Sequence, residues 1–251
     1  MTLLFQALLM PLALAAGPSR LTLRGGTHTR WSPPYHYLAE VYLPALRPVG
    51  VRAELALPQW GWYPRGGGEM TAEITPVAGG RAGLRAVEIL DRGELLGVRG
   101  LSASSHLPAH VMKRQRDQAA QRLWSRHIKA EIALCDAPSP GPGSVMFLLA
   151  RYESVNAGFT GYGRLRYPAE KVADDAFEAF DAHRMSRAAL EPHLADQLVL
   201  PLALAPGRSA YTTSEVSAHL TTVCWVVAQF LGRDVRVEGE AGQPGTVTVG
   251  A

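Results

Sequence analysis

The chain has 251 residues, 47% of them hydrophobic and 19% charged, with a formal net charge of +3 at neutral pH. This length can bury a full core in one large domain or two smaller ones, and the apolar content is ordinary for a globular protein. The two cysteines, Cys135 and Cys224, lie far apart without CxxC spacing, which excludes a disulfide framework and a zinc signature and fits a reducing cytoplasm. So small a charge supports nucleic-acid binding only weakly.

The first predicted element is an apolar run over residues 1–16 that ends in A-L-A-A. Such an ending is typical of a signal peptide, yet no Lys or Arg precedes Arg20, so the positively charged start is missing. The run is also too short to span a membrane. The pattern alone leaves two interpretations open, a signal peptide of a secreted binding protein or a buried helix.

Strands are predicted at residues 19–24, 51–57, 70–77, 84–90 and 95–102. After the first of them, Ser32-Pro33-Pro34 opens a predicted helix through about Leu46, because prolines are tolerated in the first helical turn. The loop over residues 58–68 combines glycines with four larger side chains, Trp60, Trp62, Tyr63 and Arg65. These side chains either stack a base and hold a phosphate or pack as a hairpin loop on the sheet.

A second block runs from His106 to Arg187 and has its own apolar faces. It contains a predicted helix at 108–124, strands at 128–134 and 145–152, and a helix at 168–185, the size of a small inserted subdomain. The G-F-T-G-Y-G stretch at residues 158–163 matches a dinucleotide-binding loop in its letters only. It lacks the strand–glycine–helix context, so we discount that function.

The C-terminal part holds two helix patterns, H-L-A-D-Q-L-V-L-P-L-A-L-A from His193 and a second that begins near His219. Apolar residues cover most of the second helix, which predicts a buried helix: Leu220, Val223, Cys224, Val226, Val227, Phe230 and Leu231. Its capping candidates are Thr212 with Glu215, Ser214 and Ser217. Two short strands, at residues 235–238 and 246–249, follow.

His219 is the one ionisable group near the start of this helix. The partial positive charge of a helix N-terminus favours a neutral, nucleophilic imidazole, and the unpaired N–H groups can seat a phosphate. The other interpretation is a core histidine satisfied by a backbone carbonyl, which the residues alone favour.

Five blocks of the chain, in this order, resemble the RNA 3′-terminal phosphate cyclase family: G-P-S-R-L-T-L-R-G-G-T-H-T-R-W-S-P-P, G-W-Y-P-R-G-G-G, A-S-S-H-L-P-A-H-V, H-L-A-D-Q-L-V-L-P-L-A-L-A and S-A-H-L-T-T. The resemblance implies an α+β fold built from repeated units of two helices on a four-stranded sheet, with a small inserted α/β subdomain. It makes the N-terminal run a buried helix. It divides the chain into residues 1–105, the first part of the catalytic domain, 106–187, the insert, and 188–251, the last part.

The resemblance also implies a ligase. His219 takes AMP from ATP, AMP passes to an RNA 3′-phosphate, and the 2′-hydroxyl closes a 2′,3′-cyclic phosphate. Magnesium is expected to arrive with ATP, the location to be cytoplasmic, and no membrane to take part. The residues that match the family's nucleotide site are Gln6, Pro34, His193, Leu194, Ala195, Asp196 and Gln197. A non-catalytic branch of RNA-processing or ribosome-assembly scaffolds is the alternative, but it lacks the histidine.

The resemblance departs at the start of the chain. Family members begin with a unit that carries a G-E-G-G-G-Q motif, which residues 1–251 lack, so we expect a chain that begins inside the second repeat and that could be an inactive fragment. We then expect the apolar residues of the first helix to be uncovered, because no strand precedes them. These residues are Leu3, Leu4, Phe5, Leu8, Leu9, Met10, Leu12 and Leu14.

Overall fold

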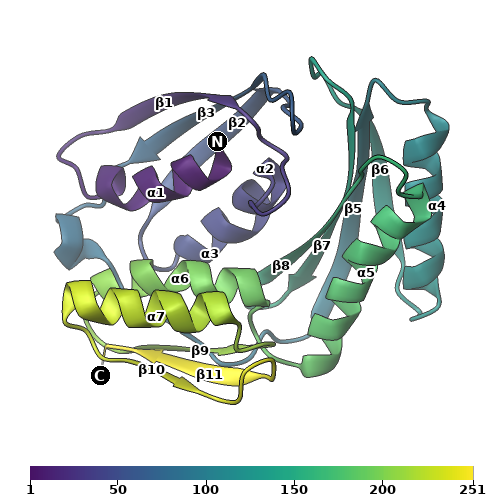
Figure 1. Ribbon diagram of the computed structural model, residues 1–251. Helices are drawn as coiled ribbons and strands as arrows, with labels where there is room; N and C mark the ends of the chain where they lie inside the picture. Colours follow the sequence, from purple (N-terminus) through teal and green to yellow (C-terminus); the bar gives the residue numbers. More distant parts are fainter. Residues whose placement is uncertain (251) are drawn as a thin grey trace.

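In the computed structural model, which describes residues 1–250, the apolar N-terminal run forms helix α1 (Thr2–Ala13) against a three-stranded antiparallel sheet (Figure 1). The sheet has the order β1-β3-β2, with β1 (Ser19–Gly25), β2 (Arg52–Gln59) and β3 (Gly68–Thr75). The expectation of an uncovered helix is wrong for Phe5, Leu9 and Met10, which lie in the core because the later strand β3 covers them. Leu3 and Leu4 are exposed.

A continuous helical segment follows the Ser-Pro-Pro sequence, as predicted. It consists of α2 (Tyr35–Tyr37), the π-helical turn η1 (Leu38–Tyr42) and α3 (Leu43–Leu46), with Pro34 at the N-cap. The side-chain amide of Asn156 donates a 2.8 Å hydrogen bond to the Glu40 carbonyl within the π turn. Such turns are rare and often lie at functional sites.

The C-terminal part forms a four-stranded sheet of order β10-β11-β9-β4. Its strands are β4 (Glu88–Ile89), β9 (Ser209–Thr213), β10 (Val235–Glu238) and β11 (Gly245–Val249). Helices α6 (Pro192–Leu204) and α7 (Ala218–Leu231) lie side by side on this sheet (Figure 1). This part confirms the predicted unit of two helices on four strands. The prediction of a strand over 84–90 is confirmed only at β4. A 3₁₀ turn, η2 (Gly80–Gly83), lies directly before the predicted segment.

The prediction that α7 is buried all round is wrong. Only one stripe, Leu220, Cys224 and Val227, is buried, at the spacing i, i+4, i+7. Val226 and Phe230 lie on the exposed side. The apolar composition indicated a buried helix, but α6 and the sheet cover only one side of α7.

The inserted unit is a sheet of order β6-β5-β7-β8, with α4 (His110–Trp124) and α5 (Ala169–Ser186) on one face (Figure 1). Its strands are β5 (Leu95–Ser105), β6 (Ala130–Asp136), β7 (Gly143–Tyr152) and β8 (Asn156–Tyr162). The unit has a hydrophobic cluster of its own. Because β5 pairs with both β6 and β7, we propose that the unit starts at Leu95 rather than at residue 106.

The glycine-rich stretch over residues 158–162 lies in strand β8, which the sequence analysis did not predict. Its glycines permit close packing instead of binding a dinucleotide. A Cβ atom at Gly158 would come within 2.8 Å of Val41 and 2.9 Å of Tyr37, and one at Gly161 would collide with the Val172 carbonyl. The strand therefore lies against the π-containing helix on one face and against α5 on the other.

Arg92, in the connection between β4 and β5, holds the two ends of the inserted unit together. Its buried guanidinium donates hydrogen bonds to three carbonyls at and after the end of α5, those of His183 (2.8 Å), Arg184 (2.7 Å) and Ala188 (3.0 Å). It also lies over the ring of Tyr152, 4.6 Å from the centroid. The side chain thus joins the segment before β5 to the segment after α5.

Candidate nucleotide site

The start of α6 is fixed by one buried carboxylate. Glu191 is the N-cap, and its two oxygens accept hydrogen bonds from the backbone N–H groups of His193 (2.8 Å) and Leu194 (2.7 Å). The Tyr37 hydroxyl also donates to Glu191. Burial raises the pKa of Glu191 above its ordinary value. This contact ties the helix that begins after Pro34 to the helix that carries the predicted nucleotide segment.

Asp196 lies one turn further along α6. Burial raises the pKa of its carboxyl to about 6, and the imidazoles of His193 and His219 oppose this shift. The charge of the same carboxyl also helps to raise the pKa of Tyr42, in the π-containing helix, and of Tyr211, in β9. Helix α6, which carries Asp196, packs against α7, β9 and the π-containing helix.

Gln197 follows Asp196 and is half-buried. Its side-chain oxygen is buried, and within residues 1–250 it has no hydrogen-bond partner. Leaving a buried oxygen unpaired costs about 1–3 kcal/mol, so such an atom usually meets a water or a ligand.

His219 is the second residue of α7. The cap is Ser217, one of the three candidates, and its hydroxyl accepts from the Leu220 N–H at 3.1 Å. The imidazole is exposed, so the alternative of a core histidine does not hold. The exposed ring is therefore accessible from solvent.

The other predicted site residues on α1, α2 and α6 are buried or half-buried. Leu194 and Ala195 are wholly buried, and the Ala195 carbonyl accepts from the Tyr211 hydroxyl at 2.6 Å. Pro34 is buried at the N-cap of α2, and Gln6 is half-buried on α1. Within residues 1–250 no side-chain hydrogen bond joins Gln6 to the residues around Asp196, so its role stays a prediction.

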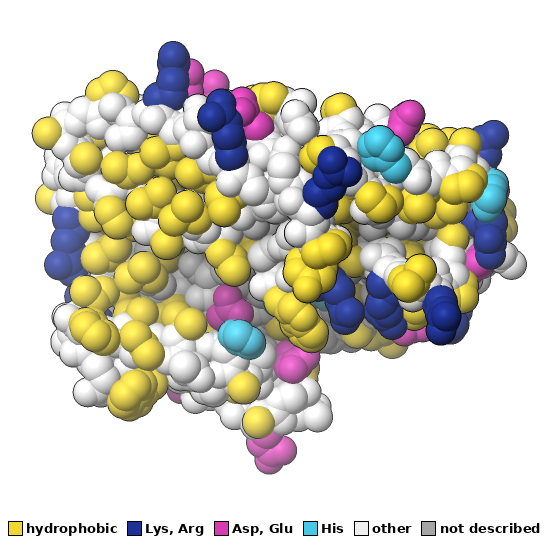
Figure 2. Space-filling model, turned by 45° about the horizontal axis from the view of Figure 1, so that its top comes forward, with side chains coloured by type: hydrophobic (Ala, Val, Ile, Leu, Met, Phe, Trp, Pro, Cys, Tyr) yellow, Lys and Arg dark blue, Asp and Glu magenta, His cyan; other side chains and the backbone are white. Residues whose placement is uncertain are grey.

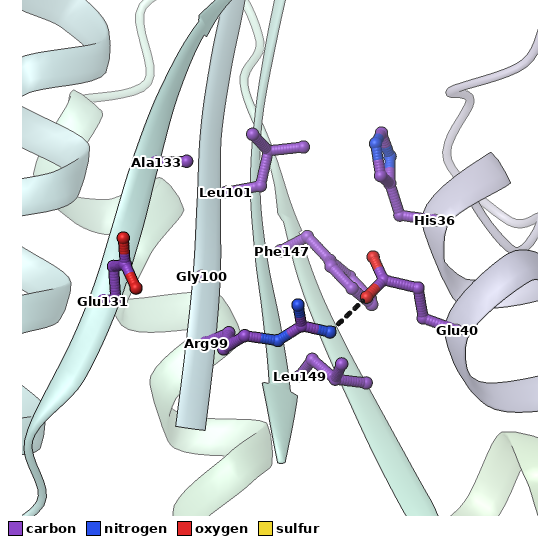
Figure 3. A pocket seen from close by; sticks show the side chains of 9 residues that line it. All are labelled: His36, Glu40, Arg99, Gly100, Leu101, Glu131, Ala133, Phe147 and Leu149. Atoms are coloured by element: carbon purple, nitrogen blue, oxygen red, sulfur yellow. Dashed lines mark hydrogen bonds and ion pairs between the residues drawn. The ribbon is translucent and has the colours of Figure 1, made fainter. Parts of the chain in front are cut away.

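A cavity of about 370 Å³ lies between the π-containing helix and the open face of the inserted sheet (Figure 3). His36 and Glu40 line it from the helix, Arg99 and Glu131 from the sheet, and an Arg99–Glu40 ion pair of 2.9 Å crosses it. Burial lowers the pKa of His36 to about 4. None of the predicted nucleotide residues lines this cavity, and sequence reasoning identified none of its residues.

Figure 2 shows how charge is distributed over one face of the molecule. Apolar side chains gather on the left half, where a histidine lies close to acidic side chains beside a hollow. Lys and Arg side chains lie mostly on the right half, over the inserted unit.

Within residues 1–250, no helix is long and apolar enough to cross a membrane.

Comparisons with known proteins identify the family of this chain. The family model described as "RTC: RNA 3′-terminal phosphate cyclase" matches residues 1–237, so the chain belongs to this family. An RNA 3′-terminal phosphate cyclase of Methylococcus capsulatus is 46% identical over 94% of this chain and 65% of its own length. One of Nostoc punctiforme is 42% identical over 94% and 66%, and one of Thermococcus gammatolerans is 38% identical over 99% and 70%.

The chain spans just under two thirds of the length of the first relatives it matches, 64–66%. The match includes both the nucleotide segment of α6 and the start of α7.

The contact between Glu191 and Tyr37 is a feature that the sequence analysis missed. The Glu191-Pro192 pair was its only local signal, because proline is favoured in the first turn directly after an N-cap.

Proposed function

We propose that this chain activates RNA 3′-terminal phosphates with ATP, by way of an AMP group carried on His219. An imidazole nitrogen of His219 attacks the α-phosphorus of ATP, an N–P bond forms, and the bond to pyrophosphate breaks. The RNA 3′-phosphate then takes the AMP group from the histidine. The neighbouring 2′-hydroxyl attacks the activated phosphate, loses its proton, and releases AMP as the 2′,3′-cyclic phosphate closes.

The single observation that carries the proposal is the exposed position of His219 in the first turn of α7, on a helix that packs against α6, which carries the nucleotide segment. The first N–H groups of a helix have no partner within the helix. Ser217 takes the N–H of Leu220, which leaves those of Ala218 and His219 for the α-phosphate. The nucleophile and the phosphate seat therefore belong to the same helical turn.

Asp196 and Gln197 are proposed to hold the nucleoside. The carboxylate accepts from the ribose hydroxyls or the adenine amino group, and the buried, unpaired oxygen of Gln197 takes another donor. His193, exposed at the start of the same helix, can stack on the base.

Nucleoside affinity is expected to fall as the pH drops below about 6. Burial raises the pKa of Asp196 to about 6, with Glu191 as a further raising influence and His193 and His219 opposing. Below that pH the carboxyl gains a proton and loses acceptor strength, so affinity should weaken by up to about tenfold per pH unit. Calorimetric titration with adenosine, which has no titrating phosphate, measures this. Asp196→Asn should bind weakly with no such pH step, and identical profiles for the two proteins would contradict the assignment.

The proposed function also needs a source of Mg²⁺ for the phosphates of ATP. Within residues 1–250, no group of three or more His, Cys, Asp or Glu side chains is arranged to hold a metal ion. Mg²⁺ commonly arrives on substrate phosphates and keeps several waters. We propose that it enters as the ATP complex, in a cytoplasmic setting.

The test is covalent labelling of the 251-residue chain. Incubation with ATP labelled at the α-phosphate is expected to leave a label on the protein, and ATP labelled at the γ-phosphate is not. Peptide mapping should locate the added AMP on the peptide that contains His219. A label on another residue, or no label under any condition, would overturn the proposed function of this chain.

A further inference from the structure

Trp31 stands out because nothing in the fold accounts for it. Its side chain is 90% exposed, and its backbone has φ = 66°, a left-handed conformation that costs a bulky residue about 1–2 kcal/mol. The Arg30 guanidinium lies 5.3 Å from the ring centroid. An aromatic ring held in solvent by a strained backbone is typical of a functional contact.

A second exposed aromatic side chain lies on the neighbouring loop. Tyr63 is 80% exposed, whereas Trp60 and Trp62 beside it are buried. Loop 58–68 was predicted either to contact a base and a phosphate or to pack on the sheet, and each of these interpretations applies to different residues of the loop. The tryptophans pack in the core, and Tyr63 and Arg65 remain available to a ligand.

The two loops form one rigid base. The N–H groups of Thr27 and His28 both donate to the Gly61 carbonyl at 3.0 Å, and the Gly61 N–H donates to the Thr27 hydroxyl at 2.9 Å. The buried His28 ring stacks on Trp60 with a centroid distance of 4.0 Å. We call the surface formed by residues 27–34 and 60–68 the rim.

The rim carries positive charge that the protein does not neutralise. Arg30 and Arg65 are exposed, and neither forms an ion pair within residues 1–250. On the strands below the rim, by contrast, Arg20 and Arg24 each pair with a glutamate. Two exposed aromatic rings beside two unpaired guanidinium groups match single-stranded nucleic acid, which offers base faces and phosphates.

We propose that the rim binds the single-stranded RNA upstream of its reacting 3′-phosphate. Trp31 and Tyr63 stack bases, and Arg30 and Arg65 bind phosphates. This rests on the proposed function for the identity of the RNA. The path is continuous in the chain, because the first rim loop ends at Pro34, where the helix begins whose Tyr37 bonds to Glu191 beside the proposed nucleotide site.

The test is fluorescence anisotropy with a labelled, unstructured twelve-nucleotide RNA that ends in a 3′-phosphate, titrated with the 251-residue chain. Trp31→Ala and Tyr63→Ala should each weaken binding about fivefold or more, as expected when one base stack is removed. Trp31→Phe should retain most of the affinity. The double variant Arg30→Ala/Arg65→Ala should lower the salt dependence of log K by about 0.7 for each phosphate that it no longer binds.

Matched controls lie at the other end of the inserted sheet. Trp124 is 63% exposed at the end of α4, and Arg151 is exposed on β7. Arg151 is eight residues along the strand from Gly143, which meets Trp62, a separation of roughly 26 Å. Trp124→Ala and Arg151→Ala should leave RNA affinity unchanged.

Adenylylation by ATP needs no RNA, so the rim variants should keep it at the wild-type level. Rim-dependent RNA binding in a chain that is never adenylylated would support the rim and refute the nucleotide chemistry. Wild-type RNA affinity in both aromatic variants would overturn the rim proposal. So would undetectable RNA binding by the wild-type chain, or variants that lose self-association in sedimentation while RNA affinity stays constant.

Discussion

Replacing His219 with asparagine is expected to abolish covalent transfer of AMP from ATP to this protein. The amide has no nucleophilic nitrogen, and the proposed chemistry has no second acceptor at the start of α7. The His219 ring is exposed and makes no side-chain hydrogen bond within residues 1–250, so unfolding free energy should change by less than about 0.5 kcal/mol. Retention of α-labelled phosphate and a melting curve measure the two effects.

The matched control is His127→Asn, because His127 is another exposed histidine and lies in the inserted unit. It should label as wild type does. Label retained by His219→Asn at the wild-type level would remove His219 from the mechanism. Loss of label together with a large drop in melting temperature would show that the substitution unfolds the protein, contrary to the exposed position of the ring.

Glu191→Ala is expected to cause the largest loss of stability of any substitution at the site. It leaves the Tyr37 hydroxyl and the N–H groups of His193 and Leu194 without their acceptor in a buried place. At about 1–3 kcal/mol for each of the three unsatisfied groups, the cost should reach at least about 3 kcal/mol. Since domains are stable by only about 5–15 kcal/mol, urea unfolding should detect the loss easily.

Glu191→Gln keeps one acceptor oxygen and should recover part of this loss. The matched control is Glu215→Ala, because Glu215 is exposed and its carboxylate makes no hydrogen bond or ion pair within residues 1–250. It should unfold like the wild type. Equal stability of Glu191→Ala and Glu215→Ala would show that the buried contact with Tyr37 contributes nothing measurable.

Most regular elements follow from local sequence patterns. Alternation predicted the strand beginning at Met70, and Ser-Pro-Pro predicted the helix that begins after Pro34. The exposed side of α7 could not be predicted in the same way, because composition does not say which neighbours cover a helix. Strand β8 was not predicted because glycines have low strand propensity. Glycine stands at these positions because the strand packs closely against Val41 and Val172.

At the site, the resemblance predicted Asp196, Gln197 and His219, and in the structure these residues lie on the neighbouring helices α6 and α7. It could not predict that Tyr37 donates to Glu191, because these residues are 154 positions apart and carry no shared local pattern. Trp31 was likewise part of a recognised block, yet its exposure and left-handed backbone depend on how loop 27–34 pairs with Gly61.

The hydrogen bonds of Arg92 have a consequence for how the family can vary. An insertion whose two ends are fastened by one guanidinium group behaves as a cassette. The three carbonyls on Arg92 hold the end of α5 beside the connection between β4 and β5. Recombination could therefore lengthen, shorten or replace the cassette while β4 and α6 keep their separation. The part that must be kept is the face of β8 that contacts the π-containing helix through Gly158 and Asn156, because that helix carries the Tyr37 that bonds to Glu191.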